Sequence, residues 1–379
     1  MREPLRLFVL AGEASGDRIG ADLVRLLRKR TELELSGVGG AELAAEGLRS
    51  MFPMSDLSVM GWSDVLVRLP LLLWRARQVA DAIIRGKPDV VVLIDSQVFV
   101  RVVAERVRKA GVGVPILLYV APAVWVWAPE RAAKLKPLFD EVLAVLPFEP
   151  RVMAELGGPA TTYVGHPALT RQTMREFQPE RGVLLLLPGS RVGELKRHLG
   201  LMRAAAEALR GHPRVSGFVL PTLSGLKERL EAEVAAWRVP VRVVAGTARD
   251  QAFADAVGAF AVSGTVTLEL AMAAVPMVVT YVGDRGQAKR YAQLDRPPMV
   301  ALPNIIAGRE VVPELLFPAE VDPAKVGPAL KALLDDVAAL DAQLAAFREI
   351  RALMQKGAPE APLVDPAERV LAARLSRDW

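Results

Sequence analysis

The chain has 379 residues, which at about 150 residues per domain predicts two or three domains. Hydrophobic residues make up 52% and charged residues 24%, a composition typical of a globular protein that excludes a disordered or fibrous one. Lys and Arg number 48 against 43 Asp and Glu, so the net charge of +5 favours phosphate ligands or an anionic membrane only mildly. The lack of cysteine excludes disulfides, iron–sulfur ligation and thiol nucleophiles, and three histidines argue against a multi-histidine metal site.

Apolar stretches that would target or anchor the chain are short or interrupted. Leu7–Ala11 is too short for the core of a signal peptide. The uncharged stretch Ala110–Pro129 has the length of a transmembrane helix, but Pro115 and Pro122 interrupt it, and Ile116–Val120 fits a buried strand better. We therefore expect a cytoplasmic protein without a membrane-spanning helix.

Short apolar runs bounded by turn residues alternate along the chain with longer stretches of helical spacing. This alternation is typical of parallel βαβ units, and runs that are almost wholly apolar predict strands covered by helices on both faces. The expected strands are Leu5–Leu10, Val90–Ile94, Ile116–Val120, Val142–Leu146 and Thr162–Val164, and then Val183–Leu187, Gly217–Leu220, Val241–Val244, Ala259–Val262 and Met277–Tyr281. The sequence thus predicts two Rossmann-like, doubly wound α/β domains.

A polar, proline-bounded segment, Pro167–Pro179, is the expected connection between these domains. We place the domains at residues 1–170 and 171–379. After Ile306 the pattern predicts helices only, and Pro362–Trp379 predicts a helix that packs back on the first domain. Two such domains facing each other form a central cleft at the carboxyl ends of their strands, where ligands of these sheets bind. That cleft is the expected active site.

Fingerprints of several common nucleotide and hydrolase sites do not occur in the sequence. It contains no G-x-x-x-x-G-K-[ST] phosphate loop, no G-x-G-x-x-G dinucleotide motif and no G-x-S-x-G nucleophile elbow. These absences weaken kinase, dehydrogenase and hydrolase interpretations.

Two loops between an expected strand and an expected helix have residues suited to an anion. Ala11–Asp17 is rich in small residues that let a ligand approach the backbone, although a tight turn capped by Ser15 or Asp17 explains it equally well. Ser190 and Arg191 begin a helix further along the chain. An arginine there opposes the helix dipole unless a ligand is present, which favours a binding role.

A third loop contains Ser263, Gly264 and Thr265, and the helix that follows carries Glu269 one turn further on. Hydroxyl and N–H groups at a helix start can hold a diphosphate, while a carboxylate one turn away can accept from a ribose diol. The alternative is an N-cap at Ser263 and a solvated Glu269. The apolar neighbours of Glu269 argue against that alternative.

Two further polar residues, Asp95 and His166, each have a possible functional role and a structural alternative. Asp95 ends the expected strand Val90–Ile94, where a carboxylate can accept a proton from a sugar hydroxyl; capping the next helix is an equal alternative. His166 lies at the expected domain junction, where a neutral imidazole can donate to a phosphate or sugar. A structural role explains His166 more simply.

The segment Met60–Ile84 places Trp62, Trp74 and several leucines beside Arg68 and Arg75. Such a mixture resembles an interfacial helix that dips into lipid headgroups. An ordinary amphipathic helix packed on a core explains the pattern as well.

Taken together and in order, these motifs resemble the lipid-A-disaccharide synthases, glycosyltransferases of the two-Rossmann-domain GT-B type. The similarity runs to about Leu316. The matching segments are A-G-E-A-S-G-D (Ala11–Asp17), G-V-G-G (Gly37–Gly40), V-M-G (Val59–Gly61), Y-V-A-P-A-V-W-V-W (Tyr119–Trp127), L-P-F-E (Leu146–Glu149), V-G-H-P (Val164–Pro167), L-P-G-S-R-x-x-E (Leu187–Glu194), S-G-T-x-x-L-E (Ser263–Glu269), P-M-V-V (Pro276–Val279) and L-P-N (Leu302–Asn304).

The resemblance implies inverting transfer of 2,3-diacylglucosamine from its UDP donor to 2,3-diacylglucosamine 1-phosphate, with a β-1′,6 linkage and release of UDP. It implies no cofactor, metal or nucleic acid, a peripheral position on the inner face of the cell membrane, and it leaves a homodimer open. It assigns the catalytic base to Asp95 and places Glu13 and Ser15 at the cleft. The implied donor site consists of Ser190, Arg191, Ser263, Gly264, Thr265, Glu269 and Asn304.

The chain departs from the family pattern on its first-domain side. The family usually continues its aspartate as D-[SA]-P-D-F-N, whereas Gln97, Val98 and Val100 stand here, and Thr170 stands in a segment that lacks the usual aspartate after V-G-H-P. The sequence thus supports UDP-sugar binding more strongly than the identity of the acceptor. The alternatives are a transferase with another envelope glycolipid acceptor, a UDP-sugar epimerase, which needs no acceptor, and a non-catalytic UDP-sugar-binding protein.

Overall fold

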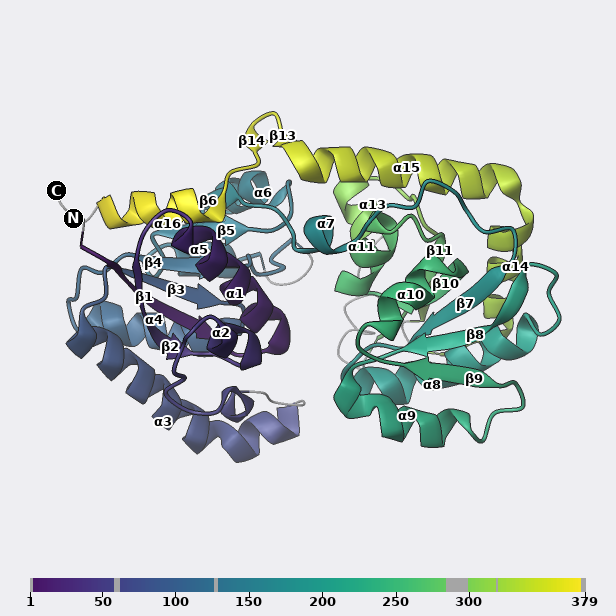
Figure 1. Cartoon of the computed structure of the whole chain (residues 1–379), viewed down its shortest axis with the longest axis horizontal. Coiled ribbons are helices and arrows are strands. Elements are labelled where there is room, and N and C mark those ends of the chain that lie inside the picture. Colours follow the sequence, from purple (N-terminus) through teal and green to yellow (C-terminus); the bar gives the residue numbers. More distant parts are fainter. Residues whose placement is uncertain (1–2, 58–61, 126–128, 284–298, 318–319, 376–379) are drawn as a thin grey trace. The chain divides into compact units, whose positions relative to one another are not determined.

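The computed structural model describes residues 3–57, 62–125, 129–283, 299–317 and 320–375, and for residues 62–67 it describes the backbone only (Figure 1). The chain divides into two compact units. Unit 1 comprises Met1–Pro167 and Met354–Trp379, and unit 2 comprises Ala168–Leu353. Each unit is built around its own six-stranded sheet.

The sheet of unit 1 has the strand order β2-β1-β3-β4-β5-β6, and all its strand pairs are parallel. Strand β2 was not expected from the sequence. Its first residues alternate between half-buried and exposed because it lies at the edge of the sheet, so it has no continuous apolar run. The strands are β1 (Leu5–Ala11), β2 (Leu33–Val38), β3 (Val90–Ile94), β4 (Ile116–Tyr119), β5 (Glu141–Ala144) and β6 (Ala160–Tyr163).

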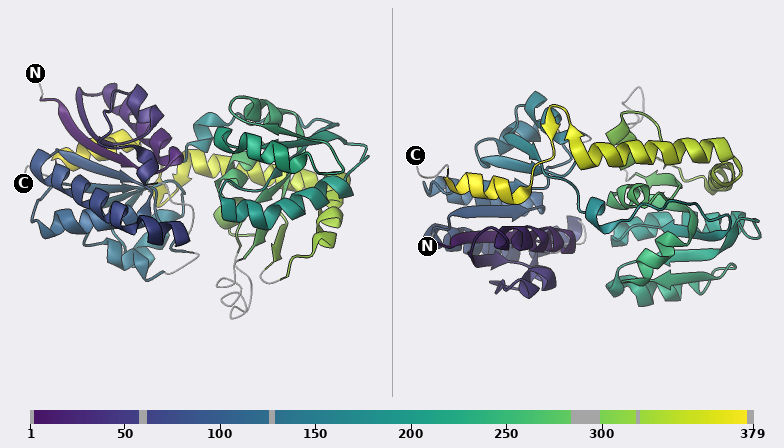
Figure 2. Two further views of the ribbon diagram at one scale, coloured as in Figure 1. Left: turned by 90° about the horizontal axis from the view of Figure 1, so that it is seen from below. Right: turned by 45° about the horizontal axis from the view of Figure 1, so that its top comes forward.

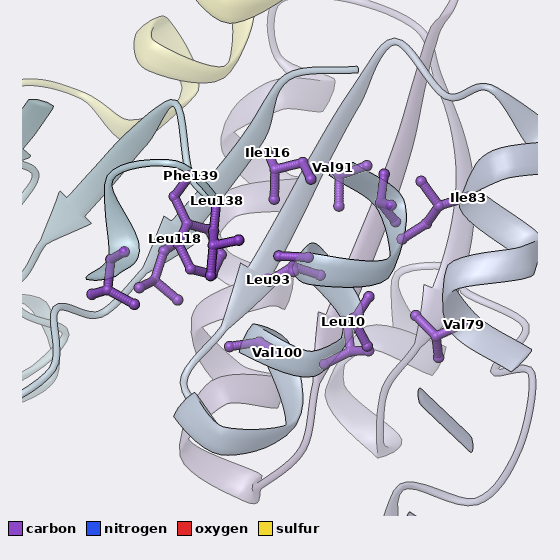
Figure 3. Close-up of a cluster of buried hydrophobic side chains, with 14 of the residues drawn as sticks. Leu10, Val79, Ile83, Val91, Leu93, Val100, Ile116, Leu118, Leu138 and Phe139 are labelled. Atoms are coloured by element: carbon purple, nitrogen blue, oxygen red, sulfur yellow. The ribbon is translucent and has the colours of Figure 1, made fainter. Parts of the chain in front are cut away.

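Helices cover both faces of this sheet. On one face, α3 and α4 pack together against a core that includes Leu10, Ile83, Leu93 and Val100 (Figure 3). On the other face, α1 packs against α16. The helices of unit 1 are α1 (Ala14–Arg28), α2 (Ala41–Ala45), α3 (Trp62–Gly86), α4 (Gln97–Lys109), α5 (Arg131–Leu135), α6 (Glu149–Glu155) and α16 (Pro366–Leu375), with a short 3-10 turn at Met54–Asp56.

Two ion pairs attach α16 to the sheet and to α1. Arg369 donates to both carboxylate oxygens of Glu141 at 2.8 and 3.0 Å, a two-bond geometry that fixes the register of the helix. Arg30, two residues after α1, forms an ion pair at 2.7 Å with Asp365, the residue before α16. Unit 1 is therefore built from two stretches of chain that are far apart in sequence.

The sheet of unit 2 has the order β12-β11-β10-β7-β8-β9, again with parallel pairs only. The expectation that the chain is wholly helical after Ile306 is wrong. A short, half-buried edge strand, β12, and a two-stranded hairpin follow, and neither is long enough to give a recognisable apolar run. The strands are β7 (Gly182–Leu187), β8 (Val215–Pro221), β9 (Val241–Val244), β10 (Ala256–Val262), β11 (Met277–Val282) and β12 (Glu314–Phe317), and the hairpin is β13 (Gly357–Ala358) with β14 (Ala361–Pro362).

Helices also lie on both faces of the second sheet, as two further views show (Figure 2). The fold class expected from the sequence, two doubly wound parallel α/β domains with helices toward the C-terminus, is confirmed. The helices are α7 (Ala168–Arg171), α8 (Val192–Ala208), α9 (Lys227–Val234), α10 (Ala248–Ala254), α11 (Thr265–Met272), α13 (Leu302–Ala307), α14 (Val326–Asp335) and α15 (Val337–Lys356), with 3-10 turns at Ser224–Leu226 and Pro323–Lys325.

The segment expected to connect the domains belongs to unit 2 from Ala168 onward. Arg175 in this segment donates to the carbonyl oxygen of Ala274 at 2.9 Å. Arg351 of α15 donates to the carbonyl oxygens of Gln172 and Met272 at 3.1 and 2.9 Å. These bonds fix the segment to the body of unit 2.

The order of strands defines one topological switch point in each sheet. In unit 1 the chain passes from β1 to β2 on one side and later to β3 on the other, so the switch point lies between β1 and β3. In unit 2 it lies between β7 and β10 for the same reason. Ligands of open α/β sheets bind outside the carboxyl ends of the strands at such points.

Candidate functional site

The switch point of unit 1 brings the expected loop after β1 into contact with the turn after β3. Gly12 follows β1, and Asp95 and Ser96 follow β3. A Cβ atom added to Gly12 would lie 2.1 Å from the hydroxyl oxygen and 3.0 Å from the Cβ atom of Ser96, so any larger residue there would require Ser96 to move. The catalytic candidates Glu13 and Asp95 are thus carried by adjoining loops.

The backbone is strained where β3 and β4 end. Asp95 and Ser96 have φ angles of 52° and 44°, and Val120 has a φ angle of 75°. Such conformations cost about 1–3 kcal/mol each and persist where the surroundings fix them, often at functional sites. The N–H of Asp95 donates to Tyr119 and that of Val120 to Leu143, each at 3.0 Å, so hydrogen bonds to the next strand hold both turns.

Asp95 is a half-buried residue, and it does not occupy the cap position of the following helix. Ser96 is the residue at the N-cap of α4. The N-cap position thus falls one residue after Asp95, and both interpretations of the Asp95 side chain stay predictions. The strained pair sets the direction in which the Asp95 side chain leaves the strand.

Glu13 and Ser15 are exposed at the start of α1. Glu13 is at the N-cap position, and its carbonyl oxygen accepts from the N–H of Asp17 at 2.9 Å. Both side chains therefore lie at the same edge of the sheet as Asp95, the edge at which the strands end.

Asp17, in contrast, is buried and has a structural role. Its carboxylate accepts hydrogen bonds from the N–H groups of Gly40 at 2.7 Å, Glu42 at 2.9 Å and Leu43 at 3.3 Å. These are N–H groups at the start of α2, where an anionic side chain is most stabilising. The A-G-E-A-S-G-D segment thus combines exposed candidates with a buried carboxylate that fixes the G-V-G-G segment.

The first loop at the switch point of unit 2 follows β7. Ser190 is exposed, and Arg191, 73% exposed, occupies the N-cap position of α8. The carboxylate of Glu194 accepts from the N–H groups of Ser190 and Arg191 at 3.0 and 3.1 Å. Glu194 also contacts the Arg191 guanidinium at 3.3 Å. This carboxylate shapes the loop and leaves most of the Arg191 side chain open to an anion.

The second loop at this switch point follows β10. The hydroxyl of Ser263 donates to the carbonyl oxygen of Val300 at 2.6 Å. Gly264 is at the N-cap position of α11, and both it and Thr265 are exposed. A Cβ atom on Gly264 would meet no atom of the described residues within 4 Å, so this part of the structure leaves room in front of the helix start. The loop therefore presents the start of α11 to a ligand, while the Ser263 hydroxyl holds its base.

Glu269 lies in the second turn of α11 and is 24% exposed. Its carboxylate forms an ion pair with Arg249 of α10. Sequence reasoning did not single out Arg249, because no pattern links residues of two different helices before the fold is known.

Asn304 differs from the other residues of the expected donor site, because it is fully buried. Its amide oxygen accepts from the N–H groups of Val311 and Val312 at 2.7 and 2.8 Å, and its amide nitrogen donates to Glu314 at 2.7 Å. Since the amide is occupied by the protein itself, Asn304 is not placed to contact a donor directly.

A hydrogen-bond relay nevertheless connects Asn304 to the second loop. Burial raises the pKa of Glu314, whose carboxylate also accepts from the N–H groups of Val300 and Ala301 at 3.1 and 2.8 Å. The carbonyl oxygen of Val300 in turn accepts from Ser263. Asn304 therefore acts on the position of Ser263 through the protein.

The two histidines near the expected site differ in burial. His166 is half-buried in the loop after β6. His198 of α8, which the sequence did not single out, is fully buried; its Nε2 accepts from the N–H of Val282 at 3.0 Å. Nδ1 therefore carries the proton and donates to the carbonyl oxygen of Glu194 at 2.8 Å. Burial lowers the pKa of His198, which stays neutral and connects the first turn of α8 to the end of β11.

Glu149, the acid of the L-P-F-E segment, is a buried carboxyl in unit 1. It accepts hydrogen bonds from the N–H groups of Val145 and Leu146, both at 2.9 Å. Burial raises its pKa to about 8, which outweighs the effect of these two bonds. Glu149 thus fixes the turn after β5.

The segment expected to contact a membrane corresponds to α3. Leu69 and Leu73 are each 42% exposed and Trp74 is 55% exposed, while Arg75 is paired with Asp56 at 2.6 Å. Met60 and the side chain of Trp62 lie outside the described residues. Among the helices of the described part of the chain, none has the length and apolar character needed to cross a membrane.

A cavity of about 390 Å³ lies at the opposite edge of the unit 1 sheet, where strands β4 to β6 begin. Its charged lining residues are paired, Arg108 with Asp140 and Arg369 with Glu141. It is therefore separate from the candidate site. Among the described residues, no group of three or more His, Cys, Asp or Glu side chains is arranged to hold a metal ion.

Solved structures of other proteins have a similar fold. UDP-GlcNAc 2-epimerase from Neisseria meningitidis, solved with UDP-GlcNAc, superposes with a TM-score of 0.60 at 12% identity and covers 98% of this chain and 99% of its own. MurG of Acinetobacter baumannii gives a TM-score of 0.54 at 13% identity over 99% of this chain and all (100%) of its own. At these identities the likeness establishes the GT-B fold alone.

Sequence comparison goes further. The family model described as lipid-A-disaccharide synthetase matches residues 7–362. The lipid-A-disaccharide synthase of Nitrobacter hamburgensis is 41% identical over 363 residues, covering 93% of this chain and 91% of that protein. That of Bradyrhizobium diazoefficiens is 38% identical over 383 residues, covering 98% and 97%. With this match over nearly its whole length, the chain belongs to the lipid-A-disaccharide synthase family of glycosyltransferases.

Proposed function

We propose that this glycosyltransferase moves the 2,3-diacylglucosamine group of a UDP donor to 2,3-diacylglucosamine 1-phosphate, forming a β-1′,6 linkage and releasing UDP. Membership of the family supports the reaction. The main support for the catalytic role is the position of Asp95, which lies on a strained turn at the switch point of unit 1, beside the loop of Glu13.

In this proposal Asp95 is the general base. Its carboxylate takes the proton of the acceptor hydroxyl while the hydroxyl oxygen forms a bond to the anomeric carbon of the donor. The bond from that carbon to the diphosphate breaks in the same step, so one displacement inverts the configuration. The strained backbone supports this role because it restricts the directions available to the carboxylate. Glu13 and Ser15 line the acceptor side.

The residues of unit 2 bind the donor. Arg191, held at the start of α8 by Glu194, and the exposed loop Ser263–Thr265 at the start of α11 stabilise the charge that develops on the departing UDP. Glu269 accepts from the ribose hydroxyls. Asn304 positions Ser263 through Glu314 and Val300 and does not touch the donor.

The exposed side chains of α3 provide a peripheral contact with the membrane that contains the acylated substrates. Leu69, Leu73 and Trp74 supply apolar surface, and arginines of the same helix suit anionic headgroups. Replacing these three residues by serine should reduce flotation with vesicles of anionic phospholipid, whereas a serine at exposed Val337 of α15 should not. Unchanged flotation of the triple variant would remove α3 from the proposal.

The deciding experiment measures UDP release from UDP-2,3-diacylglucosamine with and without 2,3-diacylglucosamine 1-phosphate, and identifies the lipid product by mass spectrometry. UDP release that depends on the acceptor, together with a disaccharide 1-phosphate, supports the proposal. Conversion of the donor without acceptor indicates an epimerase. Binding of the donor without any turnover indicates another acceptor or a binding role.

A further inference from the structure

Arg249 is a charged residue of unit 2 that the proposed reaction does not use. It extends from α10, the helix after β9, and pairs with Glu269 on α11, the helix after β10. Its guanidinium carbon also lies 5.1 Å from the centre of the Phe253 ring, which is buried. Two contacts on different elements therefore hold the guanidinium in one place.

The environment of this pair differs from that of a surface ion pair. The Arg249 and Glu269 side chains are 28% and 24% exposed. Lys227 and Glu231 on α9 form a pair within one helix at 2.7 Å, with side chains 44% and 45% exposed. An exposed pair contributes little, whereas a partly buried pair between helices fixes the orientation of its carboxylate. Arg249 thus restricts Glu269 more than an ordinary surface partner would.

The position of Glu269 relates this restriction to the ligand. Helical side chains point toward the N-terminus of their helix, so the Glu269 carboxylate is directed toward the turn that begins with exposed Thr265. Arg249 donates to the Oε2 atom of Glu269. A carboxylate has about four acceptor positions. The Oε1 atom and the remaining positions can therefore accept from two neighbouring hydroxyls.

The charge of Arg249 has a second effect. An unpaired carboxylate close to the start of α11 would repel a diphosphate bound there. Pairing with Arg249 neutralises Glu269 and lets one short helix serve both a diol and an anion. A neutral residue in place of Arg249 would remove this compensation as well as the orientation.

We propose that Arg249 is a positioning residue that orients Glu269 for recognition of the ribose 2′-hydroxyl of the nucleotide, so that it determines the preference for a ribonucleotide. The inference rests on the proposed function, in which Glu269 accepts from the ribose. Arg249 itself touches neither the sugar that is transferred nor the reacting atoms.

The test compares the dissociation constants of UDP and 2′-deoxy-UDP, measured by calorimetry on the full chain. A hydrogen bond to a charged group predicts that the wild type binds UDP about tenfold more tightly or better. Glu269→Gln should reduce this ratio. Arg249→Met should bring it to within about threefold, and Arg249→Lys, which keeps a charge but loses the planar fork, should give an intermediate ratio. Lys227→Met is the matched control and should keep the wild-type ratio.

The outcomes separate the inference from the proposal on which it rests. If Glu269→Gln loses the ratio while Arg249→Met keeps it, the role of Arg249 is refuted and that of Glu269 stands. If the wild type does not distinguish the two nucleotides, the ribose role of Glu269 fails, and the role of Arg249 fails with it. Arg249→Gln, which keeps polar N–H donors, provides a second variant should Arg249→Met fail to fold. A ratio reduced in folded Arg249→Gln supports the inference, and a wild-type ratio refutes it.

Discussion

At the switch point of unit 1, the turn after β3 places two non-glycine residues, Asp95 and Ser96, at positive φ angles, and Val120 at the end of β4 is a third. At the switch point of unit 2, the positive φ angle after β7 belongs to Gly189, which adopts it without strain. The first arrangement fixes the backbone that carries the proposed base at an energetic cost. The second exposes a helix start and its arginine to a ligand. This difference fits the two proposed roles, proton transfer in unit 1 and anion binding in unit 2.

The largest effect is expected from Asp95→Asn, which keeps the shape of the side chain but removes the base. The turnover number should fall by about 100-fold or more, as for the loss of a general base, while UDP affinity stays unchanged because unit 2 is untouched. Single-turnover kinetics and calorimetry measure the two quantities. Asp81→Asn, at a 44% exposed side chain of α3, is the control. Full turnover in Asp95→Asn would contradict the assignment of the base.

Gly12→Ala tests whether the geometry of the strained turn matters. The new methyl group would overlap with the Ser96 hydroxyl and lie 3.0 Å from the Ser96 Cβ atom, so we expect it to displace the turn that carries Asp95. A displacement of this kind should lower the turnover number by about tenfold to 100-fold. The double variant Gly12→Ala/Ser96→Gly removes the atom in the way and suits the φ angle of 44°, so activity should recover. A double variant as impaired as the single one would show that the contact between the loops is irrelevant.

Arg191→Met is the corresponding change in unit 2. Loss of a charge-assisted hydrogen bond should weaken UDP binding by about tenfold. The loss should be smaller at high salt because the Arg191 side chain is 73% exposed and its charge is screened. Lys196→Met, at an exposed position of α8, should have no comparable effect. Equal losses in the two variants would indicate general electrostatics in place of a specific contact.

Glu149→Gln is expected to have the smallest effect on activity and concerns stability alone. The folded state holds the Glu149 proton more tightly, since burial raises the pKa from 4.5 to about 8. The contribution to stability is therefore complete below the ordinary pKa and is lost as the pH rises toward about 8. The neutral amide should remove this loss, which thermal melts over that pH window would detect. Identical profiles of stability against pH for the wild type and Glu149→Gln would refute this prediction. Glu228→Gln, at an exposed residue of α9, is the control.

Most of the fold could be predicted from apolar runs, because a strand buried on both faces consists of an almost uninterrupted run of apolar residues. Strands β2 and β12 were not predicted, because edge strands are only half-buried and lack a continuous apolar run. The candidate loops were found because parallel strands place their carboxyl ends at one edge of the sheet. The structural roles of individual residues in and around these loops could not be predicted from the sequence. The capping of α2 by Asp17, the burial of Asn304 and the partner of Glu269 depend on residues distant in sequence.

The attachment of α16 to unit 1 bears on the order in which the chain folds during synthesis. Unit 1 includes both the first strand of the chain and α16, which the ribosome makes after all of unit 2. Domains otherwise tend to fold in the order in which they emerge. Here unit 2 is complete first, at a time when the ion-pair partners of Glu141 and Arg30, which are Arg369 and Asp365, have not yet been made. A nascent chain halted after Leu353 should therefore contain one finished domain, and that domain is the second.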